Sequence, residues 1–243
     1  MENSVTSSDL AKRAAATRAL EFVESGMTLG LGTGSTAEWF VRLLSERITD
    51  EGLEVLCVAT SVKTKKLADD LKIPLRTLDQ VTLIDLVVDG ADEFDSFLNL
   101  VKGGGGALLQ EKIVASSARQ MVVISDSTKE VSCLGDFGLP IEIIKFGASS
   151  TKRQVGQMLR KMGYENFDIK YRRDTENKKF LTDENHYIFD LLLGEIKNAD
   201  ELHKQLIQCP GVVETGLFIG MADIIVVGDP LGKIKLIGEA SIK

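Results

Sequence analysis

The feature that most constrains the fold of this chain is the stretch 85–112, where an apolar run ends in carboxylates and is followed by four glycines and a helical segment. The apolar run 86–88 predicts a buried strand. Glycines at 103–106 let backbone N–H groups approach a ligand that a Cβ would repel. An acidic surface loop and a flexible linker would explain either half alone. Placed together between a strand and a helix, the two halves predict the floor of a binding site.

A second glycine-rich turn, residues 30–36 (Gly-Leu-Gly-Thr-Gly-Ser-Thr), separates a predicted strand from a predicted helix. This order directs N–H groups and the positive end of the helix dipole toward a ligand, as in phosphate sites. A dinucleotide fingerprint would need glycine in place of Ser35, and a P-loop would need a lysine that the turn lacks. The turn therefore predicts a phosphate site without a nucleotide signature, the alternative being a structural turn with a helix cap.

The N-terminal half alternates between predicted strands and helices, which indicates an α/β fold with a doubly wound (Rossmann-like), mostly parallel sheet. The predicted helices are 8–25, 37–47, 62–71 and 107–118, and the predicted strands are 27–31, 53–59, 84–88 and 121–125.

Beyond residue 133 shorter strands predict a second, smaller α+β domain. The strands predicted after residue 133 are 141–145, 168–171, 180–182, 187–192, 211–218, 224–227 and 233–237, and the helices predicted after it are 151–162 and 199–208. The expected division is a Rossmann-like catalytic domain, 1–132 completed by 210–243, and a small domain, 133–209.

Polar residues follow four predicted strands of the N-terminal half. They are Thr33, the pair 60–61 (Thr-Ser), Asp89 and the stretch 125–129 (Ser-Asp-Ser-Thr-Lys). Doubly wound sheets bind ligands beyond the carboxyl ends of their strands, so we expect these side chains along one edge of the sheet.

Glu111 is the candidate base. It lies early in a predicted helix, on a face that it shares with alanines, which leaves room for a substrate. A helical glutamate beside a lysine is by itself a solvated side chain. With Asp89 and Lys102 in the same crossover, an acid, a base and a cation come together.

Composition excludes several other classes of protein. The net charge is −7, the pI is near 5.1 and the basic residues are scattered, so no nucleic-acid partner is expected. Cys57, Cys133 and Cys209 form no metal or disulfide pattern, which suits a reducing cytoplasm. The first ten residues do not resemble a signal peptide, and no apolar run is long enough to cross a membrane. His186 and His203 are expected at the surface, so carboxylates must move the protons.

These residues together predict proton chemistry on a small phosphorylated metabolite, without metal or organic cofactor. A carboxylate base can move a proton between adjacent carbons while a cation and N–H or hydroxyl donors stabilise the enediolate oxygen. Isomerisation is the expected class of reaction.

Three motifs resemble the ribose-5-phosphate isomerase family, type A, in their order and spacing. They are residues 30–37 (Gly-Leu-Gly-Thr-Gly-Ser-Thr-Ala), 89–93 (Asp-Gly-Ala-Asp-Glu) and 102–112 (Lys-Gly-Gly-Gly-Gly-Ala-Leu-Leu-Gln-Glu-Lys). Residues 211–218 (Gly-Val-Val-Glu-Thr-Gly-Leu-Phe) extend the likeness over nearly the whole chain. The least family-like stretch, 166–179, is expected to touch none of the inferred chemistry.

The resemblance implies interconversion of D-ribose 5-phosphate and D-ribulose 5-phosphate by a cytoplasmic homodimer or homotetramer. It implies that Glu111 is the base and that Lys102 stabilises the enediolate. It also implies that Asp89 assists ring opening and that Asp92 binds the sugar hydroxyls. The implied substrate-binding residues are Lys12, Thr33, Gly34, Ser35, Thr36, Asp89, Gly90, Ala91, Asp92, Lys102, Gly103, Gly104, Gly105 and Lys129. Among them, Lys12 and Lys129 would supply positive charge to the phosphate.

Three rival functions are considered. An amino-sugar-phosphate deaminase has a similar layout, but the Lys-Gly-Gly-Gly-Gly stretch followed by Glu111 favours the isomerase. A sugar-phosphate sensor of a transcription regulator should carry a basic helix-turn-helix module, for which about 26 residues before the first strand are too few. A coenzyme A transferase-like binding module rests on fold alone.

Overall fold

In the computed structural model, which describes residues 6–239, the chain divides into two units. The first comprises the residues up to 91, 110–130 and the residues from 220 onward, and the second comprises 92–109 and 131–219. Three stretches expected in the Rossmann-like domain, 92–109, 131–132 and 210–219, belong to the second unit in this division. Their strands pair with other strands of that unit.

The first unit contains a six-stranded sheet of order β13-β12-β6-β3-β1-β2. Its strands are β1 (Thr28–Leu31), β2 (Leu56–Ala59), β3 (Ile84–Gly90), β6 (Ala118–Asp126), β12 (Ile224–Gly228) and β13 (Ile234–Gly238). All neighbours are parallel except β12 and β13. The expected doubly wound, mostly parallel sheet is therefore confirmed. Because the strand order reverses between β1 and β3, the loops after these two strands flank the crevice where such sheets bind ligands.

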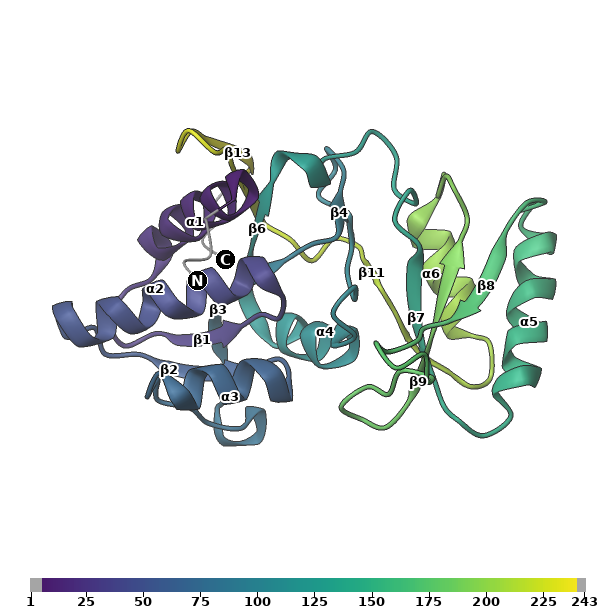
Figure 1. The fold of residues 1–243 in the computed structure, drawn as a ribbon, viewed down its shortest axis with the longest axis horizontal. Helices are drawn as coiled ribbons and strands as arrows, with labels where there is room; N and C mark the ends of the chain where they lie inside the picture. The colour runs from purple at the N-terminus through teal and green to yellow at the C-terminus, as the bar shows by residue number, and fades with distance from the viewer. Residues whose placement is uncertain (1–5, 240–243) are drawn as a thin grey trace. The chain divides into compact units, whose positions relative to one another are not determined.

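Helices cover both faces of this sheet (Figure 1). They are α1 (Ser7–Ala19), the 3₁₀ turn η1 (Leu20–Phe22), α2 (Ser35–Glu51), α3 (Val62–Asp70), the 3₁₀ turn η2 (Leu78–Gln80) and α4 (Leu108–Ser116). Leu29, Leu31 and Leu86 pack with the buried residues of α1, α2 and α3 in one hydrophobic core. The opposite face meets α4, since a Cβ on Gly30 would lie 2.8 Å from Val114 Cγ1.

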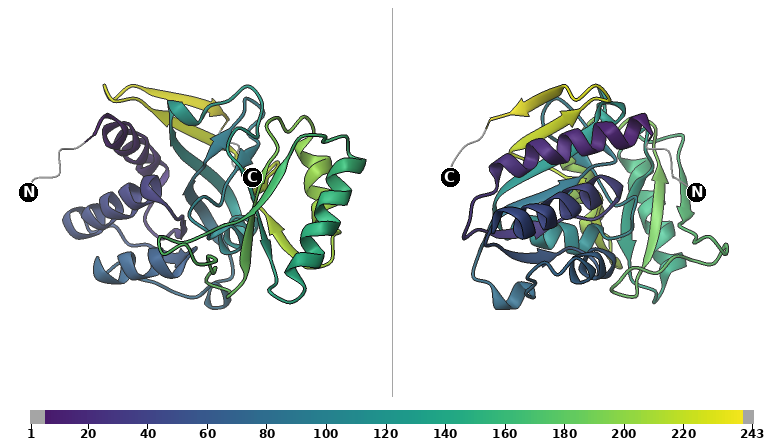
Figure 2. Two further views of the ribbon diagram at one scale, coloured as in Figure 1. Left: turned by 45° about the vertical axis from the view of Figure 1, so that its right-hand side comes forward. Right: turned by 60° about the vertical axis from the view of Figure 1, so that its left-hand side comes forward.

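The second unit combines two antiparallel sheets with two helices. The four-stranded sheet has the order β10-β7-β9-β8 and the three-stranded sheet the order β11-β5-β4. The strands are β4 (Glu93–Phe94), β5 (Leu100–Val101), β7 (Leu139–Ile143), β8 (Asp168–Tyr171), β9 (Tyr187–Leu192), β10 (Val212–Thr215) and β11 (Leu217–Phe218). The helices α5 (Ala148–Lys161) and α6 (Ala199–Ile207) lie on one side of the larger sheet (Figure 2). Their apolar faces share a second hydrophobic core with it.

Several expected elements differ in the structure. Residues 180–182 form no strand, and the expected strand 211–218 is divided at Gly216, whose N–H donates to Pro140 O at 2.7 Å. The two histidines are half-buried instead of lying free at the surface. His186 Nδ1 lies 2.9 Å from Glu142 Oε1, and His203 Nδ1 lies 2.8 Å from Thr215 Oγ1. Among the described residues, no helix is long and apolar enough to cross a bilayer.

Candidate active site

The loop after β1 is held against the end of β3 by the carboxylate of Asp89. Asp89 Oδ1 accepts hydrogen bonds from Thr33 N at 3.1 Å and from Gly90 N at 2.7 Å. Gly32 N donates to Val88 O at 2.9 Å, so the β1–β3 pairing continues into the loop. A Cβ on residue 32 would lie only 2.5 Å from Asp89 Cα, which explains why this position requires glycine. Asp89 is 1% exposed, and its carboxylate is fixed at the switch point of the sheet.

A cluster of hydroxyl groups from the segment after β2 contacts the same loop. Thr33 Oγ1 lies 2.8 Å from Thr60 Oγ1, 2.8 Å from Ser61 Oγ and 3.1 Å from Thr64 Oγ1. Thr60 also donates to Leu31 O, and Thr64 donates to Gly32 O, both at 2.9 Å. The pair Thr60-Ser61 thus reaches the sheet edge as expected, where it orders the backbone of the loop.

The N-terminus of α2 faces the same crevice without a side-chain cap. Its N-cap residue is Gly34 (φ +110°), which supplies no acceptor for the first N–H groups of the helix. Free N–H groups and the positive end of a helix dipole can attract an anion. Lys12 of α1 adds a cation, since its Nζ donates to Ser35 Oγ at 3.0 Å. Thr36 is next to Ser35, and a Cβ on Gly90 would lie 3.8 Å from Thr36 Cβ.

Glu111 lies in the first turn of α4 and is 4% exposed. One turn further on, Val114 packs against Gly30, so α4 is held directly on β1. A glycine on β1 permits this close approach, because any larger residue would push the helix away. Glu111 is therefore a buried acid on a helix that cannot easily shift.

Lys129 ends the 3₁₀ turn η3 (Ser127–Lys129), which follows β6 directly. Asp126 caps this turn by accepting from Thr128 N at 2.9 Å. Because β6 is the neighbour of β3, Lys129 belongs to the same carboxyl edge of the sheet as Asp89. Lys129 is half-buried.

Ala91 ends the first segment of the first unit, and the remaining expected residues belong to the second unit. Asp92 N donates to Val101 O at 2.8 Å, and Asp92 Oδ2 accepts from Gly104 N at 2.7 Å. Lys102 is 2% exposed; its N donates to Gly216 O at 2.8 Å, and its Nζ lies 5.4 Å from the centre of the Phe218 ring. Asp92, Lys102 and the glycine loop 103–106 are thus ordered by β5 and β11.

The expectation that residues 166–179 touch none of the inferred chemistry is wrong. Arg172 Nη1 donates to the carbonyl oxygens of Gly103 and Gly104, the latter at 3.1 Å. Next to the same hairpin, the ring of Phe180 lies where a Cβ on Gly106 would be. Neither contact has a local sequence signal, because the partners are separated by about 70 residues in the chain.

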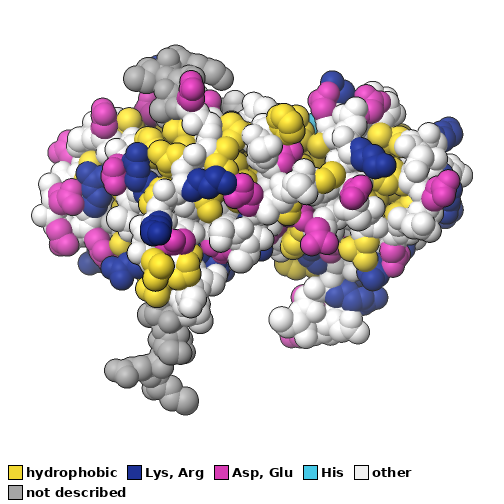
Figure 3. Space-filling view, turned by 90° about the horizontal axis from the view of Figure 1, so that it is seen from above, with side chains coloured by type: hydrophobic (Ala, Val, Ile, Leu, Met, Phe, Trp, Pro, Cys, Tyr) yellow, Lys and Arg dark blue, Asp and Glu magenta, His cyan; other side chains and the backbone are white. Residues whose placement is uncertain are grey.

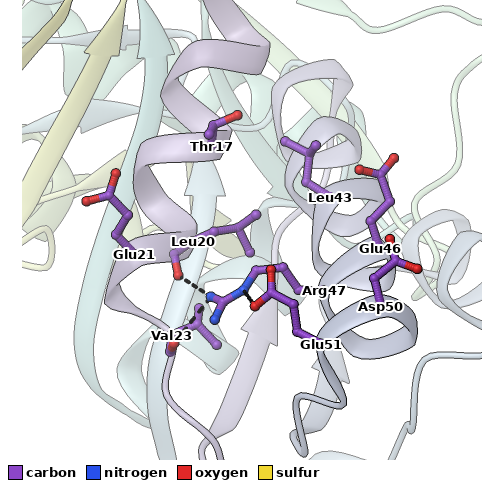
Figure 4. Close-up of a pocket in the computed structure, with 9 residues that line it drawn as sticks. All are labelled: Thr17, Leu20, Glu21, Val23, Leu43, Glu46, Arg47, Asp50 and Glu51. Carbon is purple, nitrogen blue, oxygen red and sulfur yellow. Dashed lines mark hydrogen bonds and ion pairs between the residues drawn. The ribbon is translucent and has the colours of Figure 1, made fainter.

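A cavity of about 540 Å³ lies elsewhere in the first unit, between η1 and the C-terminal half of α2 (Figure 4). Arg47 reaches across it and donates to Leu20 O at 2.8 Å, to Val23 O at 3.4 Å and to Glu51 at 3.0 Å. The guanidinium group thus satisfies carbonyls at the end of a helix. None of the expected site residues lines this cavity, and its contacts are structural.

Side chains of both charges are mixed on one face of the molecule (Figure 3). On the face drawn in Figure 3, Lys and Arg side chains are scattered among Asp and Glu side chains. Within residues 6–239, no group of three or more His, Cys, Asp or Glu side chains is arranged to hold a metal ion.

Comparisons with known proteins give one consistent family. The family model for ribose 5-phosphate isomerase A (phosphoriboisomerase A) matches residues 56–232. A ribose-5-phosphate isomerase A of Dinoroseobacter shibae is 47% identical over 248 residues, which cover 100% of this chain and 94% of the relative.

Two solved structures are similar over almost their whole length. One is a D-ribose-5-phosphate isomerase in complex with phospho-erythronic acid, with a TM-score of 0.87 and 34% identity over 96% of this chain and 100% of that chain. The other is ribose 5-phosphate isomerase from Plasmodium falciparum, with a TM-score of 0.88 and 34% identity over 95% of this chain and 98% of that chain.

Proposed function

The chain belongs to the ribose-5-phosphate isomerase A family, and from that premise we propose that Glu111 is the base of its reaction. The reaction is the interconversion of D-ribose 5-phosphate and D-ribulose 5-phosphate, an aldose–ketose isomerisation of the non-oxidative pentose phosphate pathway. It requires a proton to move between C2 and C1 through an enediolate. The observation that carries the assignment is the burial of Glu111 on a helix fixed against β1, the strand that leads into the candidate phosphate site.

The carboxylates and the lysine have distinct proposed roles. Asp89 assists ring opening and proton transfer at the sugar oxygens, and Asp92 binds the sugar hydroxyls. Lys102 stabilises the negative charge of the enediolate, which is the largest electrostatic demand of the reaction. Phospho-erythronic acid, bound in one similar structure, carries a carboxylate whose planar pair of oxygens resembles an enediolate.

The phosphate group is proposed to bind at the N-terminus of α2. Thr33, Gly34, Ser35 and Thr36 form the loop that holds the substrate, and the contact between Lys12 and Ser35 supports a cation at this position. Lys129 supplies a second positive charge. Gly90 and Ala91, together with glycines 103–105, bring backbone groups to the sugar. Local cations thus allow an acidic protein to bind a dianion.

We further propose a cytoplasmic enzyme that acts as a homodimer or homotetramer and needs no metal or organic cofactor. Equilibrium sedimentation would distinguish these two assemblies from a monomer. A single species at the mass of one chain at micromolar concentration would refute both.

The test of the catalytic assignment is the steady-state kinetics of Glu111→Gln. This substitution keeps the shape of the side chain and removes the base, so kcat should fall on the order of a hundredfold or more with little change in KM. The control is Glu51→Gln, a surface carboxylate at the far end of α2. Turnover of Glu111→Gln close to that of the control would remove Glu111 from the mechanism.

A further inference from the structure

Arg172, at the start of the connection between β8 and β9, is bound through all three guanidinium nitrogens. Its Nε donates to Asp190 Oδ2 at 3.1 Å and its Nη2 donates to Asp190 Oδ1, which makes a two-pronged ion pair. Its Nη1 donates to the carbonyl oxygens of Gly103 and Gly104. The side chains of Arg172 and Asp190 are 13% and 23% exposed, so the pair is shielded from solvent. Only a planar guanidinium can satisfy this set of acceptors together.

These contacts fix the orientation of two successive peptide planes. In a trans peptide the C=O and the following N–H point in opposite directions. With Gly103 O turned to Arg172, Gly104 N is directed away from it, and this N–H donates to Asp92 Oδ2 at 2.7 Å. With Gly104 O also turned to Arg172, the N–H of Gly105 is directed away from the guanidinium as well. The arrangement resembles the backbone concavities that bind anions.

The exposed part of the loop is held at both of its ends. Gly104 and Gly105 are exposed, whereas Gly103 and Gly106 are buried. Gly106 N donates to Gly103 O at 3.0 Å, which closes the turn. A Cβ on Gly106 would lie 2.5 Å from Phe180 Cζ, so the ring packs tightly on the second end of the loop. Four consecutive glycines would otherwise sample many conformations, because glycine has the largest conformational freedom of any residue.

We propose that Arg172, held by Asp190, is a positioning residue for the glycine loop: it orients the peptides so that Gly104 N–H holds the Asp92 carboxylate, and so that Asp92 and the N–H of Gly105 meet the sugar oxygens. This role rests on the proposed function of the loop. Without Arg172, Gly103 O keeps the hydrogen bond from Gly106 N but Gly104 O loses its contact with the guanidinium, so the peptide between Gly104 and Gly105 can rotate and its N–H turns with it. The donors are then no longer preorganised for the charge that develops in the transition state.

The experiment compares Arg172→Gln and Arg172→Lys with Arg173→Gln. Arg173 is the next residue of the same hairpin; it is exposed and donates to Asn177 O, so its loss is a matched control for charge and position. Each variant is measured by steady-state kinetics with D-ribose 5-phosphate and by hydrogen–deuterium exchange of the peptide that contains residues 103–109. Exchange reports the order of the loop whether or not the enzyme turns over.

For Arg172→Gln we expect at least a tenfold loss of kcat, a KM within about threefold of the parent value and faster exchange confined to the loop peptide. Arg172→Lys keeps the charge and most of the stem, and should fold even if the glutamine variant does not. A lysine has three donors and no planar fork, so it cannot replace the two contacts with Asp190 and the two contacts with the carbonyls together, and this variant should show the same changes to a smaller degree. Arg173→Gln should match the parent in both measurements.

Two results would overturn the proposal. One is unchanged exchange of the loop peptide in both Arg172 variants, and the other is faster exchange with unchanged kcat. These two results test the loop and not the base. The assignment of Glu111 as the base is refuted by a different result, normal turnover of Glu111→Gln.

Discussion

Gly32→Ala should damage both the stability of the protein and its activity, because the new methyl group has no space. In the structure this Cβ would lie 2.5 Å from Asp89 Cα, about 1 Å short of ordinary van der Waals contact, and closer still to the Asp89 carboxylate. The Cα is part of β3 and cannot rotate away, so β1 and β3 must separate where Gly32 N donates to Val88 O.

The expected cost follows from this overlap. Overpacking a rigid site costs roughly 1–3 kcal/mol. Because the new methyl group would meet a backbone atom that cannot move aside, we expect Gly32→Ala to cost about 3 kcal/mol. For a chain of this length each kcal/mol lowers Tm by roughly 2–4 °C, which gives a drop of about 6–12 °C. The Asp89 carboxylate must also move, and a misplacement of about 1 Å in a catalytic group can lower kcat/KM by about a hundredfold.

Thermal unfolding and steady-state kinetics of Gly32→Ala and Gly52→Ala test this reasoning. Gly52 ends α2 with φ +69° and nothing within 4 Å of a new Cβ, so its substitution strains only the backbone. That strain costs about 1 kcal/mol, with activity unchanged. If Gly32→Ala loses no more stability than Gly52→Ala and turns over normally, the close approach of Asp89 to the loop is not what fixes the site.

Three further predictions concern charge. Lys129→Ala should chiefly raise KM for the phosphorylated sugar, and an unchanged KM would reject a phosphate contact. Burial raises the pKa of Glu142, which accepts from Thr182 Oγ1 at 2.9 Å. The folded state therefore holds this proton more tightly than the unfolded chain, and the stability it contributes is complete below about pH 4.5 and is lost as the pH rises through the folded pKa. Glu142→Gln cannot ionise, so its free energy of unfolding relative to the parent should increase from pH 4.5 to 7 in urea titrations, and a constant difference would contradict this. Burial also raises the pKa of Cys57 to about 12, so iodoacetamide at pH 8 should leave Cys57 unmodified in the native protein by mass spectrometry. Its alkylation at the rate of a free thiol would refute that prediction.

The parallel sheet was predictable because its strands are short apolar runs that alternate with helices along the chain: α2 follows β1, α3 follows β2, and α4 lies between β3 and β6. Leu86, Val87 and Val88 are all buried, as both faces of the sheet are covered. The places of the candidate residues Thr33, Asp89 and Lys129 were predictable for the same reason, since they lie at or just after the ends of β1, β3 and β6.

The short strands of the second unit could not be predicted equally well. β4 and β5 contain two residues each, too few to show any period, and they lie in a stretch whose acidic residues suggest a loop. β4 pairs with β5, and β5 also pairs with β11, which is more than a hundred residues away in the chain. Residues 180–182 (Phe-Leu-Thr) include residue types that are common in strands, but Phe180 packs on Gly106 instead.

The main feature that could not be predicted from the sequence is the contact of Arg172 with the glycine loop. A lone arginine in a charged hairpin looks like a solvated side chain, and Arg173, its neighbour, is one. Only the fold distinguishes the two, because Asp190 on β9 turns the guanidinium of Arg172 toward the carbonyls of Gly103 and Gly104.

Proton exchange by NMR tests the central claim most directly. The chelator-treated protein and its Glu111→Gln variant are each incubated with D-ribose 5-phosphate in D₂O. The parent should form D-ribulose 5-phosphate with solvent deuterium incorporated, and the variant should show neither product nor exchange on the same timescale. Exchange in the variant at the parent rate would show that another group moves the proton. Binding of the sugar phosphate by the parent without exchange or product would contradict the isomerase mechanism as a whole.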